Sequence, residues 1–131
     1  MSEPRLGLEQ FSKALGKLRE FAAMPIVNDR DRAGLIQSFE FTFEQCWKVF
    51  QRAAAVQGLS AASPRQALQA ALQLGLIAAA EEDVWLAMLR DRNLTSHLDH
   101  EDIAREVADR VVSRYLPSFT AAYTKLSEQA I

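Results

Sequence analysis

The sequence predicts an all-α fold, an antiparallel bundle of four or five helices in up-and-down order. Apolar residues recur at three- and four-residue spacing along most of the chain, a spacing that places them on one face of a helix. Glycine and proline are scarce, with five and four copies, and they stand where helices would begin or end. No stretch alternates apolar and polar residues with period two, so no sheet is expected. The 131 residues fit a single domain, residues 1–131, with one core.

The first helix is expected over about residues 6–23. Its apolar positions lie three or four residues apart: Leu8, Phe11, Leu15, Leu18 and Ala22. Met24-Pro25 would end it, because the residue before a proline is pushed out of helical dihedral angles.

The second and longest helix is expected over about residues 30–57. Asn28 or Asp29 can cap its start by accepting a backbone N–H. An apolar and largely aromatic stripe at helical spacing marks its core face: Ile36, Phe39, Phe43, Trp47, Phe50 and Ala54. Gly58 is expected to end the helix with a left-handed backbone conformation.

Two shorter helices are expected to follow. The third would begin at Ser63-Pro64, an N-cap followed by proline at the first helical position, and would end near Leu74 before Gly75. The fourth is expected over about residues 79–90. Its apolar residues, Val84, Trp85, Met88 and Leu89, would face the core.

The fifth helix can be capped by Asp99, with Asp102 three residues later at its positive end. Its apolar face extends to Leu126. Pro117 is expected to bend this helix or to break it in two, because proline lacks the N–H that a helix interior needs.

Composition and charge limit the classes of function. The net charge is −2, which argues against a general nucleic-acid coat, so any contact with RNA must be local. The single cysteine, Cys46, excludes an intramolecular disulfide, fits a reducing compartment and is predicted to be buried. No apolar run approaches the roughly 18 residues that span a bilayer, and Met1-Ser2-Glu3-Pro4 lacks signal-peptide features. We therefore expect a cytoplasmic protein without a membrane partner.

The strongest functional signal is the segment RNLTSH, residues 92–97. Arg92 can grip a phosphate through two parallel hydrogen bonds, and His97 can transfer a proton near neutral pH. Asn93 adds an amide beside them. One interpretation is binding or chemistry at a phosphodiester. The other is a C-terminal helix cap followed by a solvated loop.

Glu44 lies among aromatic residues of the second helix, where a buried carboxylate is costly unless it is paired. Its partner is either Lys48, four residues later, or Arg92 or His97 across the bundle, which Glu44 would then orient. The evidence for a metal is weak, because His97 and His100 straddle a predicted helix start. We expect no metal and no cofactor, and the chain has no glycine-rich phosphate loop.

Several segments stand in a specific order along the chain: Arg30-Asp31-Arg32, Ile36 to Glu44, Trp47-Lys48, Gly58, Ser63-Pro64-Arg65, Gly75-Leu76-Ile77, Trp85, Met88, Asp91 to His97 and Tyr115-Leu116-Pro117. This order resembles the nucleotidyltransferase substrate-binding proteins, a branch of the HEPN superfamily. Each segment alone is common, but their combination is specific. The resemblance covers about residues 8–126.

The resemblance implies a HEPN-like bundle that forms a homodimer. It also implies a partner, a small separate nucleotidyltransferase encoded nearby, in a toxin–antitoxin-like pair. In many HEPN proteins an Arg-x4-His motif is a metal-independent ribonuclease site at the dimer cleft, which would make RNA a further partner. On that model His97 is the general acid or base and Arg92 stabilises the charge on the phosphate. Asn93 would orient the motif, and Glu44 would orient Arg92 or His97.

One position departs from the toxin members, which often carry a tyrosine two residues after the motif histidine, where the partner adenylylates it. Asp99 stands there, so either the modification site has moved or the protein is not controlled in that way. Tyr115 and Tyr123, the two tyrosines of the chain, are predicted to lie in core or boundary positions of the last helix.

Two functional interpretations follow. The first is a substrate-binding subunit without catalysis, favoured by acidic residues around the motif: Asp91, Asp99, Glu101 and Asp102. The second is an active ribonuclease toxin, favoured by the retained Arg92 and His97. We expect the acidic surface near the fifth helix to bind the nucleotidyltransferase. We also expect dimerisation through the face that carries Arg92 and His97. A small bundle with this many aromatic positions, among them Phe39, Phe41, Phe43 and Phe50, has more apolar surface than one helix face can bury internally.

Overall fold

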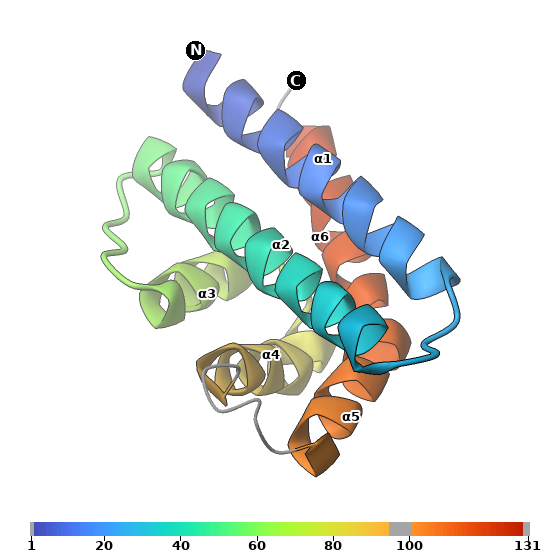
Figure 1. The fold of residues 1–131 in the computed structure, drawn as a ribbon. Coiled ribbons are helices and arrows are strands. Elements are labelled where there is room, and N and C mark those ends of the chain that lie inside the picture. The colour runs from blue at the N-terminus through green and yellow to red at the C-terminus, as the bar shows by residue number, and fades with distance from the viewer. Residues whose placement is uncertain (1, 95–100, 130–131) are drawn as a thin grey trace.

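The computed structural model describes residues 2–94 and 101–129, and all regular structure within those ranges is helical (Figure 1). The elements in chain order are α1 (Ser2–Ala23), α2 (Asp29–Val56), α3 (Pro64–Gln73), the 3₁₀ turn η1 (Ala79–Glu81), α4 (Glu82–Leu94), α5 (Glu101–Arg110), the π-helical turn η3 (Val111–Tyr115) and α6 (Leu116–Gln129). The all-α helical bundle predicted from the apolar spacing is confirmed.

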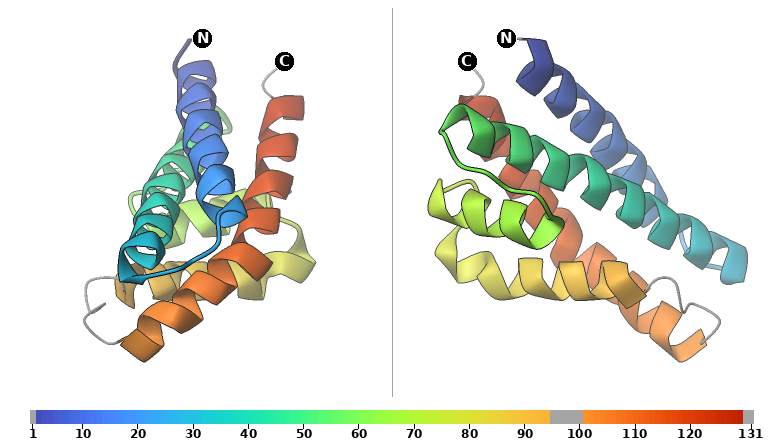
Figure 2. Two further views of the ribbon diagram at one scale, coloured as in Figure 1. Left: turned by 45° about the vertical axis from the view of Figure 1, so that its right-hand side comes forward. Right: turned by 90° about the vertical axis from the view of Figure 1, so that its left-hand side faces the viewer.

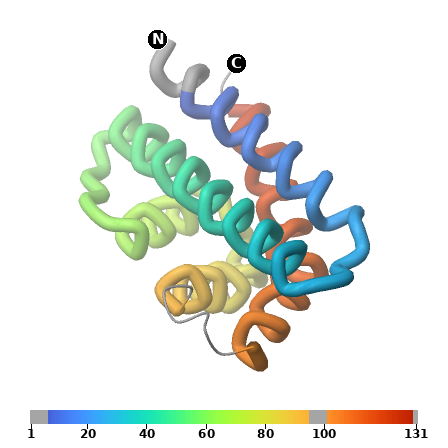
Figure 3. Tube along the Cα trace, viewed as in Figure 1, coloured from blue at the N-terminus to red at the C-terminus, as the bar shows by residue number. Residues whose placement is uncertain are grey.

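The two long N-terminal helices form an antiparallel hairpin. α6 packs along α1, and α3 lies between α2 and α4 (Figure 2). The tube in Figure 3 shows α5, η3 and α6 as one continuous path that returns to the end of the bundle where the chain begins. The described part of the chain therefore encloses one core.

Local sequence signals set the ends of α2 and α3. Asn28 and Ser63 cap these helices, each accepting the backbone N–H three residues on, at 2.9 and 3.2 Å. Gly58 and Gly75 follow the same two helices with a positive φ of 79°, a conformation that glycine adopts without the steric cost of a Cβ. The caps and stops predicted for these helices are confirmed.

The core is aromatic and closely interlocked. Phe39 is fully buried, stacks on Tyr115 with ring centroids 5.4 Å apart, and also lies against Phe43 and Phe119. Phe43 and Phe50 are fully buried as well, within one copy of the chain. Three of the four phenylalanines that were the reason to expect a dimer are therefore buried inside a single copy of the chain. Phe41 alone of that group faces outward, with 54% of its surface exposed.

α4 differs from its sequence-based prediction. It was expected to end near Arg90, but it continues to Leu94. Asp91 and Arg92 therefore lie in its last turn, and their side chains are held by helical geometry. The helix continues because both side chains bond to neighbouring helices, a tertiary effect that local propensity does not contain.

Pro117 changes the helix that contains it without interrupting it. The turn before it, η3, is π-helical, and the Leu116 N–H bonds to the Val111 carbonyl five residues earlier. Proline has no N–H to donate and its ring crowds the carbonyl four residues back, so a wider turn accommodates it. The helix expected to bend or break at Pro117 instead contains a π-bulge.

Cys46 is fully buried as predicted, and burial raises the pKa of its thiol well above the ordinary value. Within residues 2–94 and 101–129, none of the helices combines the length and the apolar content needed to cross a lipid bilayer.

Candidate functional site

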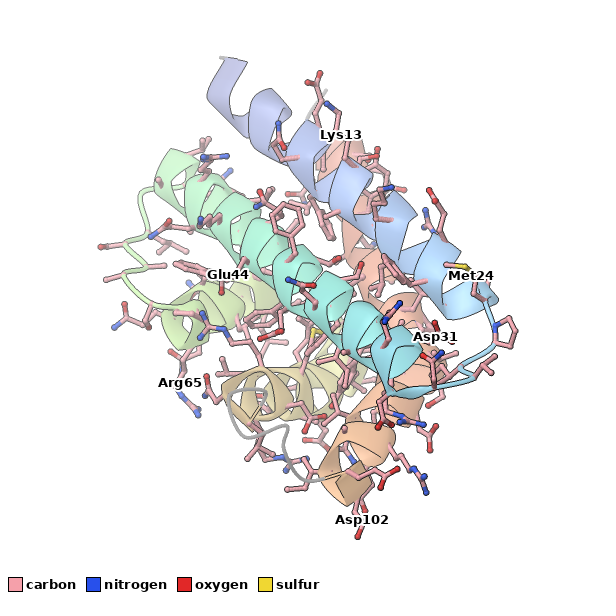
Figure 4. All side chains as sticks on the ribbon, in the orientation of Figure 1. Lys13, Met24, Asp31, Glu44, Arg65 and Asp102 are labelled. Atoms are coloured by element: carbon pink, nitrogen blue, oxygen red, sulfur yellow. The ribbon has the colours of Figure 1, made fainter. Side chains whose placement is uncertain are left out.

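The centre of the candidate site is an ion pair between α2 and α4. The Arg92 Nη2 atom lies 2.5 Å from the Glu44 Oε2 atom, joining residues 48 positions apart. Both side chains are partly exposed, Arg92 by 34% and Glu44 by 31%. Figure 4 shows Glu44 on the side of α2 that faces α3 and α4. Of the partners considered from the sequence, the structure thus gives Glu44 the arginine across the bundle.

Two neighbours complete this pair. The Trp47 indole donates a hydrogen bond from Nε1 to the Glu44 Oε1 atom at 3.2 Å, one turn further along α2. The Asn93 Oδ1 atom accepts a longer bond, of 3.4 Å, from Arg92 Nη1. Both oxygens of Glu44 are therefore engaged, and the guanidinium is held at the surface in one orientation. Asn93 contacts Arg92 directly, which is consistent with the orienting role that the resemblance implies.

A second and deeper cluster lies behind the pair. The Asp91 carboxylate is fully buried and accepts two hydrogen bonds from Arg110, at 2.7 Å from Nε and 2.9 Å from Nη2. It also accepts a hydrogen bond from the Tyr115 hydroxyl. This two-pronged geometry is the strong form of an arginine–carboxylate bond. The cluster joins α4 to the start and the end of η3.

The cluster fixes the protonation of Arg110 and Tyr115. The hydrogen bond to Asp91 raises the pKa of Arg110 above its already high ordinary value. Burial raises the pKa of the Tyr115 hydroxyl, and its hydrogen bond to Asp91 raises it further. Tyr115 therefore remains a proton donor, and Arg110 remains a cation, throughout the physiological pH range.

Asp91 was placed by sequence reasoning in an acidic surface around the motif, and that placement is wrong. Its charge is buried and neutralised by Arg110, so it adds nothing to an outward-facing field. Four exposed acidic residues lie on α5: Glu101, Asp102, Glu106 and Asp109. Glu101 pairs at 2.8 Å with Arg105, which lies one turn later on the same helix.

The Asp91 cluster is the part of the site that sequence reasoning missed. In the sequence, an aspartate next to a motif arginine cannot be told from a surface charge. Its partners, Arg110 and Tyr115, lie 19 and 24 residues further along the chain. The one local signal was the position of Tyr115 beside Pro117, where a helix was already expected to deviate. Neither Tyr115 nor Pro117 indicates from the sequence that the Tyr115 hydroxyl bonds to Asp91.

Three further residues named from the sequence, His97, Asp99 and His100, lie outside the described residues. The approach of His97 to Arg92, and the cap at Asp99, therefore remain predictions. In the part of the chain that the structure describes, no three His, Cys, Asp or Glu side chains are grouped to hold a metal ion.

The arrangement suits recognition of an anion. A guanidinium that is one-third exposed, and already oriented by a carboxylate and an amide, has the planar donor geometry that suits a phosphate.

The chain was compared with protein-family models, curated proteins and solved structures. The model of a family described as nucleotidyltransferase substrate binding protein like matches residues 6–128. The chain is also similar to a protein from Thermus thermophilus of known crystal structure, with 32% sequence identity and a TM-score of 0.76. That similarity covers 91% of this chain and 97% of the other. No curated protein matches the chain.

Proposed function

This chain belongs to the nucleotidyltransferase substrate-binding protein-like family, and we propose that it is the substrate-binding subunit of a small separate nucleotidyltransferase encoded nearby. The two proteins would form a toxin–antitoxin-like pair. The observation that carries this proposal is the partly exposed Arg92 guanidinium held at 2.5 Å by Glu44. A guanidinium held in one orientation at the surface is suited to binding a phosphate-bearing substrate.

The exposed acidic residues of α5 are the proposed contact for the nucleotidyltransferase. Asp102, Glu106 and Asp109 are exposed on one short helix, and Glu101 is the acid there that pairs with Arg105. A dense set of like charges steers a partner of opposite charge and discourages nucleic acid. Reversing the charges of Glu106 and Asp109 to lysine should slow association with the partner.

Phe41 supports a homodimer through the face that carries the site. It lies on α2 three residues before Glu44, on the same side of the helix, with 54% of its surface exposed. An exposed aromatic side chain beside an oriented ion pair is typical of an interface core. In this dimer two copies of Arg92 would approach one another and concentrate positive charge that the net charge of −2 does not suggest.

A second candidate function is a metal-independent HEPN ribonuclease toxin that cleaves RNA. Arg92 favours it, because a preorganised guanidinium at the surface is what a charged phosphate transition state needs. His97 would supply general acid–base catalysis, with Asn93 and Glu44 orienting the motif. Protein expression alone would then arrest growth, and the nucleotidyltransferase would relieve that arrest.

One co-expression experiment tests the main proposal. The chain is expressed with the neighbouring nucleotidyltransferase, and a tag on one protein is used for purification. A complex that survives washing supports the pair, and its weakening in the Glu106→Lys, Asp109→Lys variant identifies α5 as the contact. Recovery of the tagged protein alone would overturn the proposed partnership.

A cleavage assay separates the two candidates. Purified protein free of divalent metal is incubated with RNA, next to His97→Ala, Arg92→Ala and Asn93→Ala variants. Loss of about 10²–10⁴-fold in His97→Ala, a strong loss in Arg92→Ala and a smaller one in Asn93→Ala would establish the ribonuclease. No cleavage by wild-type protein, with no effect on growth, leaves the binding subunit. Cleavage that persists in His97→Ala would come from a contaminant or from another site.

A further inference from the structure

The last turn of α4 is fixed by two consecutive side chains that bond in different directions. Asp91 reaches α5 through Arg110 and η3 through Tyr115, whereas Arg92 reaches α2 through Glu44. Successive residues of an α-helix differ in direction by about 100°, so neighbouring positions can contact two different helices. The backbone of one residue cannot rotate without moving the other.

Stability alone gives little reason for the Asp91 cluster. Burying an aspartate costs desolvation free energy that its partner barely recovers, and apolar residues of similar volume usually serve a core as well. Such a cluster is better suited to imposing a single arrangement, because a carboxylate that needs three donors tolerates only one position. Asp91 is fully buried and receives three donated bonds.

The two residues that donate to Asp91 lie at either end of the π-bulge. Arg110 immediately precedes η3 and Tyr115 is its last residue, so the bulge sets the distance between them. An extra residue per turn rotates the following side chains relative to a regular helix, and π-bulges frequently occur at functional sites. A regular α-helix through residues 111–115 would turn Tyr115 away from its present direction.

We propose that Asp91, Arg110 and Tyr115 are positioning residues that hold the end of α4 and thereby aim the Arg92 guanidinium at Glu44 and the ligand. None of the three touches the ligand. The cluster acts through the backbone that Asp91 shares with Arg92, so its part in ligand binding rests on the proposed function of Arg92. Its effect on the orientation of Arg92 is independent of that function and can be measured without a ligand.

The test removes one oxygen atom. Tyr115→Phe keeps the ring that stacks on Phe39 and deletes only the hydroxyl that bonds to Asp91. Tyr123→Phe is the matched control, because it deletes the same atom two turns further along α6, from a ring that packs against Phe11. The measurement is nitrogen NMR of the arginine side chains, which reports how fast the Arg92 guanidinium rotates about its Nε–Cζ bond.

The proposal predicts that Arg92 rotates roughly five- to tenfold faster in Tyr115→Phe, the factor expected for weakening one hydrogen bond, and at the wild-type rate in Tyr123→Phe. Arg110→Lys, which keeps the charge but offers one compact donor group, should give the same acceleration of Arg92. Where Tyr115→Phe does not fold, Arg110→Lys provides the result. An unchanged Arg92 rotation in the folded variants would overturn the proposal and leave the cluster a structural element.

A binding measurement then separates this inference from the proposed function. Wild-type protein and Tyr115→Phe are each titrated with the neighbouring nucleotidyltransferase. Faster Arg92 rotation with intact binding of the partner supports the positioning role and shows that the partner contact lies elsewhere, on α5. Faster rotation with no binding by either protein supports the positioning role and refutes the proposed partnership.

Discussion

Two ion pairs on the last turn of α4 differ in burial, and that difference predicts a large contrast between two conservative substitutions. Asp91→Asn changes a carboxylate that is fully buried, whereas Glu44→Gln changes one that is 31% exposed. Each substitution replaces one carboxylate oxygen by an NH₂ group and keeps nearly the same side-chain volume. The contrast therefore isolates charge and its burial from packing.

The magnitudes follow from what each substitution leaves behind. Asp91→Asn leaves the Arg110 guanidinium against a neutral amide whose single oxygen accepts at most two hydrogen bonds, where the carboxylate accepted three. Breaking a buried pair costs about 3–5 kcal/mol, and the 27% exposure of Arg110 places this case at about 3 kcal/mol. Glu44→Gln removes a partly exposed pair, for which about 0.5–1 kcal/mol is expected.

Thermal unfolding followed by circular dichroism converts these free energies into melting temperatures. At about 2.1 cal/mol/K per residue, a chain of 131 residues has an unfolding entropy of about 0.28 kcal/mol/K. Asp91→Asn should then lower Tm by about 11 °C and Glu44→Gln by about 2–4 °C. Equal shifts in the two variants, or a shift of less than about 4 °C in Asp91→Asn, would refute the reasoning that burial makes the Asp91 pair costlier to break than the Glu44 pair.

Three further predictions concern pH, backbone conformation and assembly. Because the pKa of Tyr115 is raised in the folded protein, the stabilisation that its hydroxyl provides is fully present below the unfolded tyrosine value of about 10 and is lost as pH rises above it. Urea unfolding at about pH 8 and about pH 11 should show a larger loss in wild-type protein than in Tyr115→Phe, and equal losses would contradict this. Gly58→Ala should destabilise the protein by about 1 kcal/mol, because φ is 79° there. Gly16→Ala, in the interior of α1 with free space around the added methyl, should stabilise it by about 0.5–1 kcal/mol. Changes of the same sign in the free energy of unfolding of the two variants would contradict this reasoning. Phe41→Glu should convert the proposed dimer to a monomer at micromolar concentration in light scattering, and a wild-type mass of one chain would count against the dimer itself.

Helix positions could be predicted from the sequence because their signals are local. Asn28, Ser63, Gly58 and Gly75 each act within one turn of their own helix, through a side-chain acceptor or a positive φ. The same reasoning failed at the end of α4, where continuation to Leu94 depends on bonds to α2 and η3. Local propensity carries no information about such partners.

For the same reason, the sequence identified the residues of the candidate site that need partners but not the partners themselves. Glu44 was identified as a carboxylate that needs a partner, and Arg92 was one of three partners considered. Choosing between Lys48 and Arg92 required the fold, since one lies four residues away and the other 48. The burial of Asp91 required still more, because it depends on a π-bulge whose only local signal is Pro117.

Nucleotidyl transfer by the neighbouring enzyme tests the central claim most directly. The purified nucleotidyltransferase is given a labelled nucleotide and a small-molecule extract as the source of acceptors, with or without this chain, and incorporation of label is followed. We expect transfer to depend on the chain and to fall by about 10- to 100-fold with Arg92→Ala, since a central arginine contact is worth about 1–3 kcal/mol. Arg90→Ala, on the exposed side of the same helix, should behave as wild-type. Equal transfer with and without the chain would contradict its role as the substrate-binding subunit.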